Sequence, residues 1–195
     1  MQVFRDPISE NLPGQQKKES KEGTLDPELV RSIDALSAHE GAHAFVSVKL
    51  GIPLMRLETA ITRKGDHYEQ LGGVAWSDLR GVSTEARGIS YTAGLAGELF
   101  IMGEEYVRRS GFRGLRTDSK RLNALGYTTQ EQKAELLTKA LRVLADNREE
   151  FYTFCDNLRV AIKEATHDEG VSLELTSYEI SQLMEPTASK EPQGR

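Results

Sequence analysis

The sequence predicts a mainly α-helical α+β domain with one small sheet or β-hairpin. Several long segments carry apolar residues at the helical period, whereas one pair of shorter segments is typical of extended strands joined by a turn. The 195 residues suffice for one sizeable core but not for two full domains. We therefore expect a single domain over residues 24–185, flanked by polar, disordered ends at residues 1–23 and 186–195.

The first helix is predicted over residues 27–50. Asp26 is a suitable N-cap, and Pro27 takes the first helical position, where its missing N–H costs nothing. The segment Gly51–Pro53 then ends the helix. The sequence HEGAH at His39–His43 therefore falls in the C-terminal half of a long helix.

A β-hairpin is predicted directly after this helix. Residues 54–61 alternate loosely between apolar and polar, residues 62–67 are rich in turn formers, and residues 68–76 form the second strand. The adjacent Gly72 and Gly73 predict either a bulge or a place where another backbone approaches closely. The second strand is either an ordinary sheet strand or an edge strand that pairs with an extended substrate.

A second helix, unusually rich in alanine and glycine, is predicted over residues 84–103, with Gly103 at its end. Its small residues would let it pack closely against a neighbouring helix. A glycine- and arginine-rich loop over residues 104–117 then leads to a short helix that begins near Asp118.

The longest helical pattern spans residues 128–165 and indicates either one bent helix or two helices. Thr129 and Gln132 form a capping-box pattern at its start, and Thr176 and Glu179 repeat that pattern before a last short helix. Helices are therefore expected to dominate the C-terminal half of the domain.

The charge of the chain argues against nucleic acid as a partner. The formal net charge is −5, and a protein that binds the phosphate backbone needs concentrated lysine and arginine. The arginines of the 104–117 loop are interpreted instead as solvated side chains or as contacts to substrate carbonyls. They are Arg108, Arg109, Arg113 and Arg116.

Three further features concern location and packing. No apolar run approaches the length of a membrane span, and the first twenty residues lack the apolar segment of a secretory signal. Cys155 is the single cysteine, which excludes an intramolecular disulfide and a zinc site built from several cysteines. We therefore expect a cytoplasmic protein with no membrane span, in which Cys155 packs as a small hydrophobic residue. The single tryptophan, Trp76, is expected in the core or in the wall of a side-chain pocket.

The segment His39–His43 carries the HExxH pattern. Histidines four residues apart lie on one face of a helix, so both imidazoles can reach a single ion. Glu40 is rotated by about 100 degrees from His39 around the helix axis, which takes it off the ion but within reach of a water beside it. This arrangement is typical of zinc hydrolases, in which the glutamate takes the proton of the attacking water. The alternative is a pair of ordinary histidines on a buried or exposed helix face.

A catalytic zinc ion needs a third protein ligand and one open position. The two other histidines, His67 and His167, stand in segments typical of turns and are interpreted as solvated residues. The spacing HExxHxxGxxH is excluded because residues 44–49 read AFVSVK. The third ligand is therefore an aspartate or a glutamate, and the pattern alone does not choose among the thirty acidic residues.

Four segments, taken in order, resemble the peptidase domain of the FtsH family, the membrane-bound AAA+ zinc proteases. HEGAHA at residues 39–44 is similar to the family's HEAGHA, and AGLAGELF at residues 93–100 is similar to its GGRAAEEL. GLRTDSKRL at residues 114–122 is similar, in order and spacing, to the family segment that holds an aspartate ligand. SLELTSYEISQLM at residues 172–184 resembles the family's C-terminal leucine-rich stretch. The resemblance covers residues 27–185.

This resemblance implies a zincin-like fold and a Zn²⁺ site. His39 and His43 would be two ligands and Asp118 the third, with Glu40 as general base and then general acid. Glu98, at the first glutamate of GGRAAEEL, either orients a zinc-bound histidine through its other ring nitrogen or serves only in helix packing. The resemblance also implies a hexameric ring. Because the chain has no GxxxxGK[ST] phosphate loop, any unfoldase would be a separate ATPase, and otherwise the substrate would arrive unfolded.

The sequence thus predicts a zinc-dependent endopeptidase that hydrolyses unfolded or flexible polypeptide. Two alternatives stay open: a non-catalytic adaptor or binding module with the same fold, and a metal-dependent hydrolase of another amide substrate. An intact Glu40 argues against the adaptor, because a scaffold has no need of a base beside the metal. An extended groove past the metal would favour the peptidase, and a closed pocket would favour a small substrate.

Overall fold

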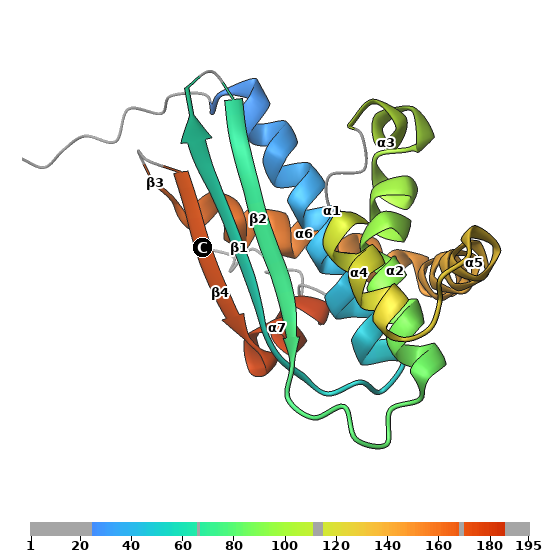
Figure 1. Cartoon of the computed structure of the whole chain (residues 1–195). Coiled ribbons are helices and arrows are strands. Elements are labelled where there is room, and N and C mark those ends of the chain that lie inside the picture. The colour runs from blue at the N-terminus through green and yellow to red at the C-terminus, as the bar shows by residue number, and fades with distance from the viewer. Residues whose placement is uncertain (1–24, 66, 111–114, 168–169, 186–195) are drawn as a thin grey trace, which may run out of the picture.

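The computed structural model describes residues 25–65, 67–110, 115–167 and 170–185 (Figure 1). Over these residues the chain has a mixed α+β fold that is mostly helical, with a small antiparallel sheet of four strands. This confirms the predicted fold class at that level. The two ends predicted to be disordered, residues 1–23 and 186–195, lie outside the described residues.

In the described part of the chain, one helix precedes a pair of strands, five helices follow, and two further strands and a last helix complete the order. The helices of the described part are α1 (Pro27–Lys49), α2 (Thr84–Ile101), α3 (Glu104–Ser110), α4 (Leu115–Ala124), α5 (Gln130–Asp146), α6 (Arg148–Glu164) and α7 (Ser177–Met184). The strands are β1 (Leu54–Lys64), β2 (His67–Trp76), β3 (Thr166–His167) and β4 (Gly170–Thr176). None of these helices is both long and apolar enough to cross a bilayer.

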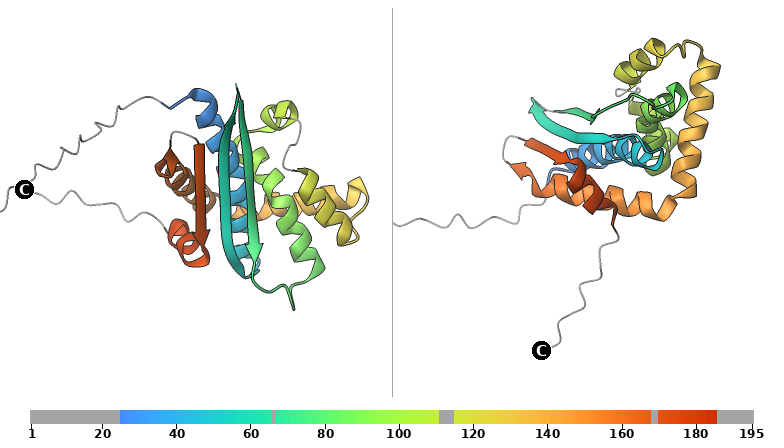
Figure 2. Two further views of the ribbon diagram at one scale, coloured as in Figure 1. Left: turned by 60° about the vertical axis from the view of Figure 1, so that its left-hand side comes forward. Right: turned by 90° about the horizontal axis from the view of Figure 1, so that it is seen from below.

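Helix α1 lies at the centre of the fold, between the sheet and α2, with α6 packed along it, whereas α7 packs against β1, β4 and α6 (Figure 2). Its start follows the prediction, because Asp26 Oδ1 accepts a hydrogen bond from the Glu28 amide at 2.9 Å and Pro27 is the first helical residue. The chain turns at Gly51, whose φ of 68° is unfavourable for a residue with a side chain. The central position of α1 explains why most of its residues are buried.

The sheet has the order β2-β1-β4-β3, so β2 is an edge strand among the described residues. β1 and β2 form the predicted antiparallel hairpin. The bulge that was one option at Gly72 and Gly73 is not there, since these residues pair in register with Thr59 and Glu58. The register shifts instead near Leu54, at the other end of the hairpin.

Four elements differ from the prediction, and one of them is strand β4 (Gly170–Thr176), where no strand was predicted. Residues 104–110 form helix α3 rather than a loop, and α4 begins at Leu115, so that Asp118 lies in its first turn rather than at its start. His167 lies in the short strand β3 and not in a turn. The long C-terminal pattern forms two helices that meet at Asn147. Both predicted capping boxes are present, and Cys155 is buried in α6 as expected.

The core lies where α1 meets α6 and the inner face of the sheet. Phe45 of α1 packs against Phe151 and Phe154 of α6, with ring centroids 5.3 and 6.1 Å apart, and all three rings are fully buried. Leu57 and Ile61 of β1 cover the sheet side of the same cluster. α1 is therefore packed on several sides, which fixes the orientation of the side chains of its HEGAH segment.

Replacing Gly97 by alanine is expected to destabilise the fold by about 1–3 kcal/mol. Alanine normally favours a helix over glycine by about 1 kcal/mol. Here, however, a Cβ atom would overlap the carbonyl oxygen of Ala38. This oxygen belongs to the backbone of α1, which cannot move aside as the end of a flexible side chain could. Denaturant unfolding measures the loss. Gly41→Ala is the matched control because its Cβ would meet only side-chain ends, the nearest being Leu158 Cδ2 at 3.3 Å. Equal stabilities of the two variants would contradict this close α1–α2 contact.

Candidate metal centre

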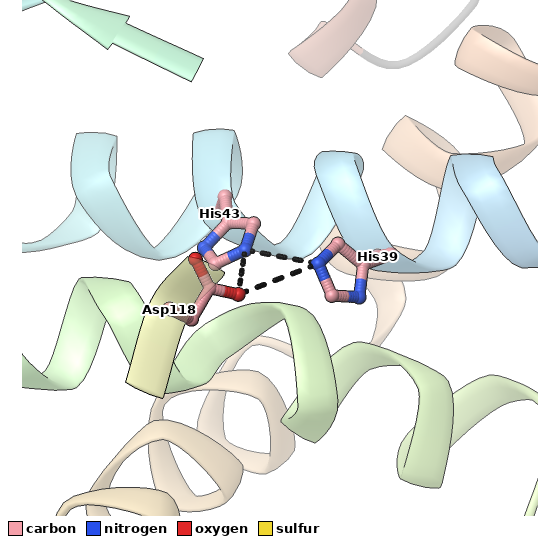
Figure 3. A group of neighbouring side chains, drawn as sticks. All are labelled: His39, His43 and Asp118. Carbon is pink, nitrogen blue, oxygen red and sulfur yellow. Dashed lines mark hydrogen bonds and ion pairs between the residues drawn. The ribbon is translucent and has the colours of Figure 1, made fainter. Parts of the chain in front are cut away.

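Two histidines of α1 and one aspartate of α4 meet in a buried cluster (Figure 3). His43 Nε2 lies 3.3 Å from His39 Nε2. Asp118 Oδ2 lies 3.5 Å from His39 Nε2 and 3.2 Å from His43 Nε2. The three side chains are close enough to bind one metal ion, and the described residues contain no other such group of three. The ligand set predicted from the sequence thus lies together in the structure.

Each histidine is held by a hydrogen bond from its other ring nitrogen to helix α2. His39 Nδ1 donates to Glu98 Oε1 at 2.6 Å, and His43 Nδ1 donates to the carbonyl oxygen of Ser90 at 2.7 Å. In the neutral ring, a proton on Nδ1 leaves Nε2 with a free lone pair, which is the form that binds a metal. Of the two roles considered for Glu98, its position favours the one that orients His39.

The small residues of α2 make room for the two imidazoles. A Cβ atom at Gly94 would lie 2.5 Å from His39 Nε2 and 2.5 Å from His43 Nε2, in the space that those nitrogens face. The backbone of α2 can therefore pass directly beside the ligand atoms. The alanine- and glycine-rich pattern predicted close helix packing, and at this position the closeness serves the metal centre.

Glu40 lies next to the cluster, against the edge strand. It is 6% exposed, and its Oε2 atom is buried without a hydrogen-bond partner. Its carboxylate packs on Gly72 of β2, where a Cβ atom would lie 2.6 Å from Oε1. The close approach predicted at Gly72 and Gly73 is thus made by a side chain at Gly72, and not by another backbone.

The buried charges perturb one another strongly. Burial alone would lower the pKa of His39, but hydrogen bonds with Asp118 and Glu98 and the charge of Glu40 raise that pKa to about 10. Burial would raise the pKa of Asp118, yet the facing rings of His43 and His39 hold that pKa well below its usual range. For Glu40, burial dominates and raises the pKa above the ordinary value of a glutamate. The cluster therefore pairs an ionised aspartate with a carboxyl that is ready to hold a proton.

Zinc uptake by the metal-free protein is expected to release about one proton at pH 8. The raised pKa of His39 means that its ring is protonated at this pH, and a metal can bind only the neutral ring. Zinc affinity should therefore increase as the pH rises, by roughly tenfold per pH unit, until the pH reaches about 10. Calorimetry measures the number of protons released, if the binding enthalpy is compared in several buffers that differ in ionisation enthalpy and bind zinc only weakly. Binding enthalpies that do not depend on the buffer would contradict this coupling.

The sequence predicts a hydrolytic zinc site, and on that prediction replacing Gly72 by alanine should lower hydrolytic activity at least about 100-fold, the contribution of one general base, without loss of zinc binding. The added methyl group would displace the Glu40 carboxylate but would not reach the ligands. Peptide hydrolysis and zinc stoichiometry are measured on the same sample. Gly73→Ala is the matched control, since its Cβ would meet nothing within 4 Å. Similar activities of the two variants would contradict the contact between Glu40 and the edge strand.

Of the other residues considered from the sequence, those that the structure describes are not part of the ligand cluster. His67 and His167 are exposed and take no part in the cluster. Trp76 is partly buried and packs against the core, which favours the first of its two interpretations. Arg108 and Arg109 lie in α3 and pair with Glu105. Arg113 lies outside the described residues, as does the side chain of Arg116.

Two contributors to the site gave no sequence signal. The carbonyl of Ser90 acts through the backbone, so its residue type carries no information about its role. Ser47 Oγ lies 2.7 Å from Ser90 Oγ and links α1 to α2, although a serine in a helix normally bonds locally or to water. Gly94 could have been found only by assuming that α2 packs on the histidine face of α1.

No protein-family model matches the sequence. No curated protein matches it either. The function is therefore inferred from the geometry and chemistry of the site itself.

Proposed function

We propose that this protein is a zinc-dependent endopeptidase that hydrolyses unfolded or flexible polypeptide. One observation carries the proposal: three buried ligand atoms converge on one point, and Glu40 lies beside them with a carboxylate oxygen that lacks a partner. A structural metal site needs no such carboxylate, whereas a hydrolytic site needs a base.

The donor set and its spacing support zinc. Two imidazole nitrogens and one carboxylate oxygen form a ligand set that is typical of catalytic zinc, which keeps its fourth position for water or substrate. A tetrahedral ion with bonds of about 2.0–2.1 Å separates its ligand atoms by about 3.3–3.4 Å. The three observed separations are 3.2, 3.3 and 3.5 Å. An octahedral magnesium ion would bring neighbouring ligands to about 2.8–3.0 Å and would favour oxygen donors.

The residues around the ligands support hydrolysis. Bound zinc would supply Lewis acidity, lowering the pKa of a water and polarising the scissile carbonyl group. Glu40 takes one proton from the attacking water as the new C–O bond forms, and gives that proton to the amide nitrogen as the C–N bond breaks. The products are a carboxylic acid and an amine. The raised pKa of Glu40 suits a group that must hold a proton between these two transfers.

The edge strand supports a polypeptide substrate. Among the described residues β2 pairs with a strand on one side only, and Gly72 on β2 touches Glu40. An extended peptide that pairs with β2 would therefore run past the base, held by main-chain hydrogen bonds that do not depend on its sequence. A small amide substrate would gain nothing from such an edge, which favours the endopeptidase over the second hydrolase.

The order of the elements supports a zincin-like domain of the FtsH type. A ligand helix, a hairpin, a helix of small residues that carries Glu98, and an aspartate on the next helical segment follow one another as the resemblance implies. On the same resemblance we propose assembly into a ring and work with a separate ATPase unfoldase. Sedimentation of the purified zinc-loaded protein tests the ring directly.

The test of the proposed function is cleavage of an unfolded polypeptide in ¹⁸O-labelled water. The zinc-loaded protein is expected to produce internal cuts, each new carboxyl group carrying one ¹⁸O atom, and the metal-stripped protein is expected to produce none. Cleavage of small N-acyl amino acids but not of polypeptide would favour the other amide hydrolase. Tight zinc binding without cleavage of either substrate would favour the adaptor.

A further inference from the structure

Trp76 stands at the end of the edge strand β2 and makes two polar contacts in different directions. Its indole Nε1–H donates a hydrogen bond to Ser47 Oγ at 3.1 Å. Its ring lies under the guanidinium of Arg121, with 5.6 Å between Arg121 Cζ and the ring centroid. Packing against the core alone would require neither contact, so both call for an explanation.

The first contact leads to the ligand His43. Ser47 and Ser90 are 0% and 1% exposed, and their Oγ atoms lie 2.7 Å apart across the α1–α2 contact. The carbonyl oxygen of the same Ser90 accepts the hydrogen bond from His43 Nδ1. Because Ser47 Oγ accepts from Trp76, its own proton is free to be donated to Ser90. The residue that orients His43 is thus fixed through Ser47 by the indole of Trp76.

The second contact leads to the ligand Asp118. Arg121 Nη1 lies 3.7 Å from Asp118 Oδ1, while the other oxygen, Oδ2, faces the two histidines. The guanidinium is held in place by two aromatic rings, since Tyr91 also lies 5.6 Å from Arg121 Cζ and packs edge-on against Trp76 at 5.3 Å. A cation beside Oδ1 holds the carboxylate in an orientation in which Oδ2 alone faces the point where the three ligand atoms converge, called the ligand point below.

We propose that Trp76, Ser47 and Arg121 are positioning residues for the metal centre, with Trp76 joining the end of strand β2 to the ligands His43 and Asp118. The inference rests on the proposed function, because it concerns the same metal. None of the three residues reaches the ligand point itself, so each acts through a ligand. Outer partners of this kind typically contribute 10- to 100-fold in metal affinity.

The experiment measures zinc affinity by competition with a chromophoric chelator, which needs no catalytic turnover. Arg121→Met, which removes the cation, is expected to weaken zinc binding by about 10- to 100-fold. Trp76→Phe, which keeps a ring under Arg121 but removes the N–H, and Ser47→Ala should each weaken it by about tenfold. Arg121→Lys keeps the charge but not the planar group, so it should restore only part of the affinity.

A double-mutant cycle separates the two branches. Trp76→Phe and Ser47→Ala remove the same hydrogen bond, so their combined effect should be smaller than the sum of their free-energy changes. Ser47→Ala and Arg121→Met act on different ligands, so their effects should add. Thermal unfolding of each metal-free variant confirms that the fold is retained. Additive effects of the first pair would contradict the proposed branch to His43.

Two matched controls separate positioning from general packing. Arg148→Met removes an exposed arginine that lies 5.4 Å from the Tyr152 ring, remote from any ligand contact. Ser37→Ala removes a buried serine of α1 whose hydroxyl donates to the Ile33 carbonyl at 2.7 Å. The inference would be overturned, but not the proposed function, if Arg121→Met and Trp76→Phe bound zinc within twofold of the unaltered protein. The same holds if they bound zinc no more weakly than the two controls. A failure of the unaltered protein to bind zinc would overturn the proposed function as well.

Discussion

Replacing Glu40 by glutamine is expected to abolish peptide hydrolysis while leaving zinc in place. The amide has the size of the carboxylate, so it can still pack on Gly72 of the edge strand. It cannot take a proton from water, however, and loss of a general base typically lowers the rate by about 10²- to 10⁴-fold. Glu40 is not among the three clustered ligands, so zinc stoichiometry should stay at its original value.

The measurement pairs the turnover rate on an unfolded polypeptide with metal analysis of the same sample. Glu58→Gln, an exposed glutamate of β1, controls for the loss of one charge near the hairpin. Full activity of the Glu40→Gln variant would remove Glu40 from the mechanism. Loss of zinc together with activity would mean that Glu40 serves the metal rather than the proton transfer.

Replacing Gly94 by alanine is expected to weaken zinc binding strongly. The new methyl group would lie 2.5 Å from the Nε2 atoms of both His39 and His43, in the space between α2 and the ligand point. The rings cannot swing away without breaking their hydrogen bonds to Glu98 and to the Ser90 carbonyl. Since two of the three ligands are displaced at once, affinity should fall by roughly 100-fold or more.

Gly88→Ala is the matched control for Gly94→Ala, because it lies on the same helix and is also crowded. Its Cβ would lie 2.9 Å from Leu136 Cδ1 and from Tyr127 Cε2, which are side chains of the packing and not ligands. Both variants should lose stability, but only Gly94→Ala should lose zinc in the chelator competition. Retained zinc affinity in the Gly94 variant would show that α2 does not limit the space at the metal centre.

The parts of the fold that the sequence predicted depend on local signals. Asp26 and Pro27 define the start of the ligand helix, and the alternation around a turn defines the hairpin. The HExxH spacing brings His39 and His43 to one face because a helix repeats every 3.6 residues. These features follow from neighbours in the chain, so tertiary packing did not need to be known.

The missed elements have two causes, a distant partner for strand β4 and a local restart of the chain for helix α3. Strand β4 is short, and its register is set by pairing with β1, more than a hundred residues away in sequence. Helix α3 follows Gly103, whose positive φ ends α2 and lets the chain start a new helix at once, where the arginines suggested a loop. The choice of Asp118 among many acidic residues came from a resemblance, because helical spacing carries no information about a third ligand on another helix.

The contacts that complete the site belong to the same long-range class. Each of these contacts is made between elements that are far apart along the chain. They are the hydrogen bond from His43 to the Ser90 carbonyl, the close approach of Gly94 to the two imidazoles, and the packing of Glu40 on Gly72. A glycine signals a close approach without naming what approaches. The sequence therefore predicted the chemistry of the ligands better than the structure that supports them.

The most direct test of the account is anomalous diffraction at the zinc absorption edge, on crystals of the zinc-loaded protein. We expect a peak, present above the edge and absent below it, within about 2.0–2.2 Å of His39 Nε2, His43 Nε2 and Asp118 Oδ2. We also expect the Glu40 carboxylate to lie beside the peak without bonding to it. A peak at other residues, or three side chains that point apart in zinc-replete crystals, would contradict the metal centre and the function proposed from it.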